Sequence, residues 1–291
     1  MLSRLLVGLL WLLHFLPLTV LARCGSGLGS AFFRLGRRRR HIVLVNLRLC
    51  FPELDEAQRQ DMARAHFRVL GRSMLERSLL WWASRARLSR LLRVEGEERM
   101  RTLLAAGRPV LMLTPHFVGL DVGGAAIAMR FDCASIYAVQ SNRVFDRLLL
   151  RGRQRFGDQL LLSRQEPVRA SVRAMRAGRP LYYLPDMDFG RRDSIFVPFF
   201  GVQAATVPGL SRLARLAGAT VVPCLTRILP DGGGYLVTVG EPWRDFPGRD
   251  VEADTARMNA FIEEAIRTMP EQYYWVHRRF KTRPEGESRP Y

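Results

Sequence analysis

The sequence predicts an α/β fold in which helices flank a mixed, largely parallel sheet, with an apolar membrane-anchor helix ahead of it. The first observation is an alternation: short, continuously apolar runs bounded by Gly or Pro are followed by amphipathic runs of helical period. Strands that are buried on both faces between helices give this pattern. The second is size, because 291 residues with 48% hydrophobic content can bury the core of one large or two small domains. The third is an uncharged N-terminal segment.

That segment reads LLVGLLWLLHFLPLTVLA over residues 5–22 and contains no charged side chain. It is marginally long enough to span a bilayer and also suits a tilted or interfacial helix. His14 and Pro17 weaken a clean span. A cleaved signal peptide is the alternative, since Arg4 precedes the apolar run. We expect an uncleaved anchor, because the residues after the segment are strongly basic.

Basic residues gather on the C-terminal side of the apolar segment, whereas one arginine precedes it. The positive-inside rule therefore places the body of the protein in the cytoplasm. A polybasic cluster at this position also lies at anionic headgroups, where each charge contributes about 1 kcal/mol. The basic residues on the C-terminal side are Arg23, Arg34 and the run Arg37–Arg40.

The helical segment after this basic cluster begins with clear start signals. Pro52 and Asp55 are typical of a helix N-terminus. Apolar residues at helical spacing then continue to about Trp82, which predicts one or two amphipathic helices. A short helix over 97–106 is stopped by Gly107. We divide the chain into a hydrophobic anchor (1–22) and an α/β domain (23–291), the latter made of a basic helical segment (23–95) and a catalytic core (96–291).

In the core, strands and helices alternate. Continuous apolar runs predict strands at 109–114, 134–139, 180–185, 220–225 and 235–239. Helical periodicity predicts helices over 119–129, 145–156, 168–177, 207–217 and 254–269. This order is that of a layered α/β fold.

The charge balance points to an anionic partner. There are 45 basic and 27 acidic side chains, which gives a net charge of +18, and Lys281 is the one lysine. Nucleic acid, a phospholipid surface, a phosphorylated substrate and an acidic protein are all possible partners at this stage. Arginine is suited to bidentate phosphate contacts. The arginines are dispersed and no helix-turn-helix, RNA-binding or zinc motif occurs, which argues against nucleic acid.

The cysteines suggest no disulfide framework and no metal knuckle. None lies close to another in the sequence, so they are expected to be reduced thiols of a protein exposed to the cytosol. They are Cys24, Cys50, Cys133 and Cys224.

The candidate active site is the segment His116-Phe-Val-Gly-Leu-Asp121. His116 follows a predicted buried strand at its C-terminal end, where α/β sheets bind their ligands. Asp121 falls in the first turn of the next helix, from which its carboxylate can reach one imidazole nitrogen. Such a carboxylate fixes the tautomer and raises the basicity of the other nitrogen, which can then accept a hydroxyl proton. Taken alone, this spacing is also compatible with a strand-end histidine that has no catalytic role.

Several further motifs occur in order along nearly the whole chain. With His116 and its acid five residues on, they make the sequence resemble the late (secondary) lipid A biosynthesis acyltransferases of Gram-negative bacteria, the group of lauroyl and myristoyl transferases. The chain has Asp121 where that family usually has Glu. The other motifs are NLRLCFPE (46–53), Gly152-Arg153, PDMDFG (185–190), FVPFF (196–200) and PEQYYWVHRRFKTRPEG (270–286).

The resemblance implies a glycerolipid-acyltransferase-like fold and an enzyme of the bacterial inner membrane whose catalytic domain is cytoplasmic. It would transfer a fatty acyl chain from acyl carrier protein to a hydroxyl of a lipid A precursor of the Kdo2-lipid IVA type, in lipopolysaccharide biosynthesis. His116 would be the general base and Asp121 its orienting acid. The expected partners are acyl carrier protein, the lipid A precursor and an anionic membrane. Direct transfer from a thioester needs no cofactor and no metal.

The resemblance also assigns substrate contacts. Arg153 matches a functional family position that is expected to contact a phosphate or the thioester region. Asp186 matches another, which is expected to position the substrate or another side chain. We extend the substrate-contact prediction to Arg155 and Asp188. The Asp-x-Asp spacing could suggest Mg²⁺, but thioester transfer does not require it. The aromatic and basic residues at 273–279 are expected to be structural, with some headgroup contact.

Two alternatives remain open. One keeps the enzyme class and changes the acceptor to a phospholipid or another hydroxylated lipid. Against it, the sequence PDMDFG stands where phosphate-ester acyltransferases usually carry an EGTR-type block. The other is a non-enzymatic, basic, membrane-tethered binding protein.

Overall fold

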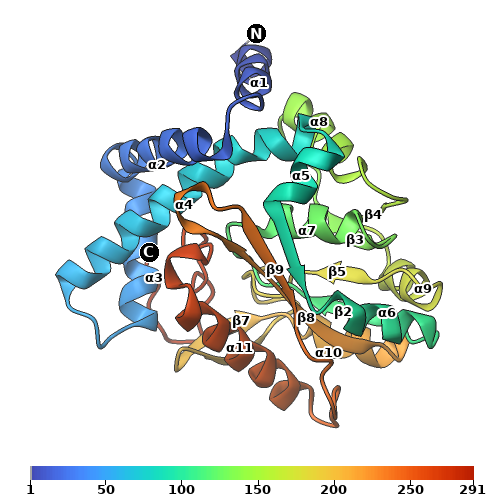
Figure 1. Cartoon of the computed structure of the whole chain (residues 1–291). Helices are drawn as coiled ribbons and strands as arrows, with labels where there is room; N and C mark the ends of the chain where they lie inside the picture. Colours follow the sequence, from blue (N-terminus) through green and yellow to red (C-terminus); the bar gives the residue numbers. More distant parts are fainter. Residues whose placement is uncertain (1) are drawn as a thin grey trace.

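The computed structural model describes residues 2–291, and its central feature is a seven-stranded sheet with the order β1-β9-β8-β2-β5-β3-β4 (Figure 1). Neighbouring strands run parallel, except that β8 and β9 are antiparallel. The predicted class, a mixed and largely parallel sheet flanked by helices, is confirmed. The strands are β1 (Leu92–Glu95), β2 (Val110–Leu113), β3 (Ala134–Tyr137), β4 (Leu160–Ser163), β5 (Leu181–Tyr183), β8 (Thr220–Ile228) and β9 (Tyr235–Val239).

Two strands of this sheet, β1 and β4, form where the sequence predicts none. Both are edge strands, and both are only partly buried. An edge strand needs no continuous apolar run, which is why the pattern did not reveal them. A separate hairpin is made of β6 (Ile195–Phe199) and β7 (Val202–Thr206). Phe200 and Gly201 form its two-residue turn, with φ values of 51° and 73°, as a tight hairpin turn of the primed type requires.

Helices cover both faces of the sheet. The segment predicted as one or two helices is a single helix, α4, which begins at a capping box between Asp55 and Gln58. The helices are α1 (Leu2–Leu13), α2 (Leu18–Leu35), α3 (Arg37–Cys50), α4 (Glu56–Trp82), α5 (Arg85–Leu91), α6 (Glu97–Ala105), α7 (Leu120–Ala128), α8 (Arg143–Arg153), α9 (Val168–Arg176), α10 (Gly209–Ala217) and α11 (Val251–Thr268), with short 3₁₀ turns η1 (Pro230–Gly232) and η2 (Pro270–Gln272).

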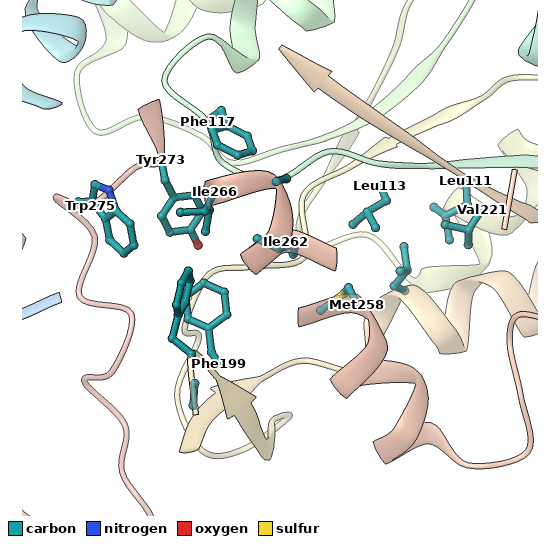
Figure 2. Packing of buried hydrophobic residues seen from close by; sticks show 14 of the residues in the cluster. Leu111, Leu113, Phe117, Phe199, Val221, Met258, Ile262, Ile266, Tyr273 and Trp275 are labelled. Carbon is teal, nitrogen blue, oxygen red and sulfur yellow. The ribbon is translucent and has the colours of Figure 1, made fainter. Parts of the chain in front are cut away.

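Alternate residues of the central strands supply two separate layers of the core. Leu111 and Leu113 of β2 belong to one layer, and Figure 2 places them near Met258 and Ile262 of α11. Met112, between them in the sequence, belongs to the layer on the other face, with residues of α7. Because β2 is buried on both faces, its sequence is continuously apolar, as predicted.

The N-terminal apolar segment is not one continuous helix. It is divided between α1 and α2 by a turn that ends at Pro17, and Figure 1 shows α1 projecting away from α2. Proline lacks the N–H that would continue the helix. Leu18 and Leu21, predicted to be part of the anchor, are instead buried in the protein at the start of α2. Within residues 2–291, no helix combines the length and apolarity that crossing a membrane demands.

Candidate active site

Two neighbouring strands bring His116 and Asp186 to the same edge of the sheet. β2 and β5 pair in parallel, with Leu113 opposite Tyr183. The loops that follow these strands therefore leave at one edge, and each begins with a short segment containing a proline, Pro115 in one and Pro185 in the other. His116 thus lies past the C-terminal end of a buried strand, as the sequence predicts.

Asp186 holds His116 by two hydrogen bonds. The ring Nδ1 lies 2.6 Å from Asp186 Oδ1, and the backbone N–H of His116 donates to Oδ2 at 2.9 Å. Asp186 is fully buried, whereas 18% of the His116 side chain is exposed. Because an ionised carboxylate only accepts, Nδ1 carries the hydrogen and the lone pair of a neutral ring is at Nε2. Nε2 of a neutral ring can therefore accept a proton.

Electrostatics keep Asp186 ionised. Burial raises the pKa of its carboxyl, but the charge and the hydrogen bonds of His116, with a further hydrogen bond from Tyr273, outweigh burial and lower that pKa below its ordinary value of 3.8. A buried charge is stable only when it is paired and hydrogen-bonded. Both conditions are met here.

Asp121 makes a different contact from the one predicted. Its Oδ2 lies 2.6 Å from Nη2 of Arg77, and its Oδ1 lies 3.3 Å from Nη2 of Arg153. The expected hydrogen bond from the His116 ring to Asp121 is not found among the contacts of residues 2–291. The prediction that Asp121 holds the ring is corrected, because the ring contacts Asp186 instead. Two guanidinium groups attract the Asp121 carboxylate, and the imidazole nitrogen that a carboxylate holds, Nδ1, is engaged by Asp186.

The same two arginines set the ionisation of Asp121. Burial raises the pKa of this carboxyl, but the charges and hydrogen bonds of Arg77 and Arg153 prevail, so the pKa lies below 3.8. The position of Asp121 in the first turn of α7 is as predicted. Arg77 of α4, Asp121 of α7 and Arg153 of α8 thus form one side-chain cluster.

Arg155 is occupied by the protein itself. It donates through Nη1 to the carbonyl of Leu80, and through Nη2 to that of Ala83 at 2.7 Å. Both carbonyls lie at the C-terminal end of α4, where unpaired carbonyls and the helix dipole attract a cation. Its guanidinium also lies 4.9 Å from the Phe156 ring centroid. These contacts give Arg155 a structural role, and its substrate contact stays a prediction.

Asp188 is likewise engaged inside the protein and is 1% exposed. Its Oδ1 accepts from the N–H of Gly190 at 2.8 Å and from Oγ1 of Thr282 at 2.9 Å. Its Oδ2 accepts from the backbone N–H of Thr282 at 2.9 Å, and its own N–H donates to Nε2 of His277 at 3.0 Å. Asp188 therefore fastens the C-terminal segment to the loop after β5, and its substrate contact stays a prediction.

The C-terminal motif lies against the His116 loop. The backbone N–H of Val118 donates to Gln272 O at 2.8 Å, and that of Tyr274 donates to His116 O at 2.9 Å. These bonds flank a bridge between Phe117 and Tyr273, whose side chains are close together in Figure 2. The structural role predicted for this motif agrees with the contacts.

Sequence reasoning did not identify Arg77. A signal was present, because the residues three and four positions away on α4 are Ser73, Met74, Leu80 and Trp81. An arginine in mid-helix without an acidic neighbour on its own face can pair with a carboxylate from another element. That the counter-charge is Asp121 depends on the packing of α4 against α7.

Comparisons with known proteins show the family to which the chain belongs. Residues 1–282 match the family described as bacterial lipid A biosynthesis acyltransferase. The chain is 39% identical to the lipid A biosynthesis lauroyltransferase of Escherichia coli (strain K12) over 281 residues, 96% of this chain and 91% of the relative. It is 34% identical to the palmitoleoyltransferase of that organism (98% and 92%) and 32% identical to its myristoyltransferase (94% and 83%). The chain therefore belongs to the family of bacterial lipid A biosynthesis acyltransferases.

Proposed function

We propose that this acyltransferase moves a fatty acyl chain from acyl carrier protein to a hydroxyl of a lipid A precursor of the Kdo2-lipid IVA type. The observation that carries the proposal is the His116–Asp186 pair at the C-terminal edge of the sheet. The family membership supports the reaction class. The acceptor hydroxyl belongs to an acyl chain that is already attached to the disaccharide.

His116 is the general base in this proposal. Its Nε2 takes the proton of the acceptor hydroxyl while the hydroxyl oxygen forms a bond to the thioester carbonyl carbon. The carbon–sulfur bond then breaks, and the carrier thiolate leaves and receives the proton from the imidazolium. A positioned base typically contributes about 100- to 10,000-fold to such a step. Asp186 keeps the ring oriented and stabilises the imidazolium.

Asp121 and Arg153 contribute to the same site by a different route. Asp121 holds the guanidinium of Arg153, whose side chain is 35% exposed and can face a substrate. We also propose that the helical segment (23–95) and the core (96–291) work as one acyltransferase domain, because α4 reaches the site through its contact with Asp121.

Membrane association is the second part of the proposal. α1 exposes several large apolar side chains, and an exposed apolar helix surface can insert into the interface of a bilayer. With the basic cluster Arg37–Arg40, it would hold the enzyme on the anionic cytoplasmic face of the bacterial inner membrane. The exposed residues on α1 are Leu5, Leu6, Leu9, Trp11 and Leu12.

The proposed function is tested by incubating the purified protein with acyl-acyl carrier protein and tetra-acylated lipid A precursor, and weighing the product by mass spectrometry. We expect the acceptor to gain the mass of one acyl chain. His116→Ala should lose at least about 100-fold in rate, whereas His41→Ala, an exposed histidine on α3, should remain near the wild type. Absence of any product from the wild-type protein would refute the proposed acceptor, and a fully active His116→Ala variant would refute the proposed base.

A further inference from the structure

Three helices each place one charged side chain at a single point. Arg77 comes from α4, Asp121 from α7 and Arg153 from α8, with N–O distances of 2.6 and 3.3 Å. Asp121 lies in the first turn of the helix that follows the His116 loop, and Tyr182 of β5 fixes the start of that helix by donating to Leu120 O at 2.9 Å. The cluster is thus tied to the edge of the sheet where His116 lies.

The charges in this cluster do not balance. Two guanidinium groups share one carboxylate, so one positive charge is left over. The guanidinium-bearing side chains are 33% and 35% exposed, whereas that of Asp121 is 18% exposed. Both arginine side chains are therefore more accessible to solvent than the carboxylate that they share.

An ion pair within α4, between Arg72 and Glu76, is an example of a purely structural arrangement. Arg72 and Glu76 lie 2.7 Å apart and are 8% and 1% exposed. Glu76 also accepts from the Tyr235 hydroxyl at 2.7 Å, and Arg72 donates to Leu229 O at 3.0 Å. That pair is balanced in charge and closed to solvent, which the Arg77 cluster is not.

Hydrogen-bond capacity is also left over. Arg77 and Arg153 each use Nη2 on Asp121, although a guanidinium carries five N–H donors. Within the part of the chain that the structure describes, the buried Nε of Arg77 has no partner, but neither has Nη2 of Arg72; surplus charge and exposure are what distinguish the Arg77 cluster. Planar guanidinium groups with free donors and surplus charge are the usual protein ligands of phosphate.

We propose that Arg77 and Arg153 form one phosphate-binding subsite, with Asp121 as the internal strut that sets their spacing. This rests on the proposed function, in which phosphate esters occur in both substrates. The acceptor carries phosphates on its disaccharide, and the donor carries a phosphodiester in the arm that links the acyl thioester to the carrier protein. Binding either one places the reacting chain relative to His116, so Arg77 is a substrate-binding residue of the reaction.

Steady-state kinetics on matched substrates test the subsite. We compare wild type, Arg77→Gln and the control Arg68→Gln, which removes an exposed arginine from the same helix. Acceptors are the complete precursor and two forms that each lack one phosphate. Donors are acyl-phosphopantetheine and acyl-pantetheine, which differ by the phosphate.

The expected result is a roughly 10- to 100-fold higher KM for Arg77→Gln, the range of a lost charged hydrogen bond, with a smaller change in kcat and no change in Arg68→Gln. If the phosphate belongs to the acceptor, Arg77→Gln and the wild type should have the same KM for one of the two acceptors that lack a phosphate. If the phosphate belongs to the donor, the two proteins should have the same KM for acyl-pantetheine. A KM difference of equal size between Arg77→Gln and the wild type on every substrate would overturn the subsite and leave Arg77 a structural residue.

A folding control keeps the test decisive. Should Arg77→Gln melt far below the wild type, Arg77→Lys replaces it, because lysine keeps the charge and loses the planar fork. The KM of Arg77→Lys should lie between those of the wild type and Arg77→Gln, and it should depend on the same phosphate. Failure of the subsite is distinct from failure of the proposed function, since the latter appears as absence of transfer by the wild-type enzyme.

Discussion

Asp186 Oδ1 lies 2.6 Å from Nδ1 of His116, and its Oδ2 accepts from the backbone N–H of the same residue at 2.9 Å. This two-point contact prevents the carboxylate from rotating without losing a bond. It also fixes the ring to the backbone from which it projects. The base is therefore oriented by a residue that lies 70 positions away in the sequence and one strand away in the sheet.

The contact between α2 and α4 gives a stability prediction. A Cβ built on Gly29 would lie 2.0 Å from Phe67 O, a distance at which the two helices must separate. Gly29→Ala should lower the free energy of unfolding by about 1–3 kcal/mol, as overpacking does.

Gly27→Ala is the matched control, because nothing lies within 4 Å of its added Cβ in the same helix. It should be neutral or stabilising, since alanine favours a helix by about 1 kcal/mol over glycine. Chemical denaturation of both variants checks this prediction. Equal stabilities for the two variants would show that the close approach of α2 to α4 does not exist in solution.

His66 gives a pH prediction. Burial lowers its pKa from 6.5 to about 4, although the hydrogen bond to Glu271 O partly opposes this. Between these values the unfolded chain binds a proton that the folded chain does not, so the free energy of unfolding falls as pH falls from 6.5 towards 4. At pH 5 the loss from His66 is about 2 kcal/mol relative to pH 7.

Denaturation of His66→Gln at pH 7 and pH 5 checks the sign and the size. This variant keeps an N–H donor for the Glu271 carbonyl and has no titrating ring, so its stability should change less between the two pH values. His41→Gln, on an exposed histidine, should follow the wild type. A pH dependence in His66→Gln equal to that of the wild type would contradict the lowered pKa.

The apolar surface of α1 predicts membrane binding. Trp11→Glu and Leu12→Glu place a charge on side chains that are 45% and 58% exposed. Each should weaken co-sedimentation with anionic phospholipid vesicles by about tenfold, because the apolar face of an interfacial helix supplies the binding energy. Leu216→Glu, on the 53% exposed Leu216 of α10, should leave binding unchanged. Equal binding by all these variants would exclude α1 as the contact surface.

The central strands were predictable from sequence, because burial on both faces requires continuous apolar runs such as that of β2. The edge strands β1 and β4 carry no such run. The glycine in the Phe200-Gly201 turn of the β6–β7 hairpin is typical of tight turns and could have indicated this one. The motif FVPFF was interpreted only as a family resemblance, which does not by itself indicate a hairpin. The continuous helix expected over residues 5–22 is interrupted because Pro17 restricts the backbone more than the apolar composition favours a single helix.

The site was predictable in part. His116 was placed correctly, because a strand end is a local feature of the sequence. Its partner was not, since Asp121 is near in sequence whereas Asp186 is near through the pairing of β2 with β5. The contact of Arg77 with Asp121 depends on the packing of α4 against α7, which no local sequence pattern indicates.

A double-mutant cycle on His116 and Asp186 tests the catalytic pair most directly. Purified wild type, His116→Ala, Asp186→Asn and the double variant are compared by the rate of acyl transfer to the lipid A precursor, after circular dichroism has shown that each is folded. If Asp186 acts by orienting His116, its loss has no further effect once the imidazole is gone, and the double variant should be no slower than His116→Ala. Losses that multiply in the double variant would contradict a role of Asp186 through His116.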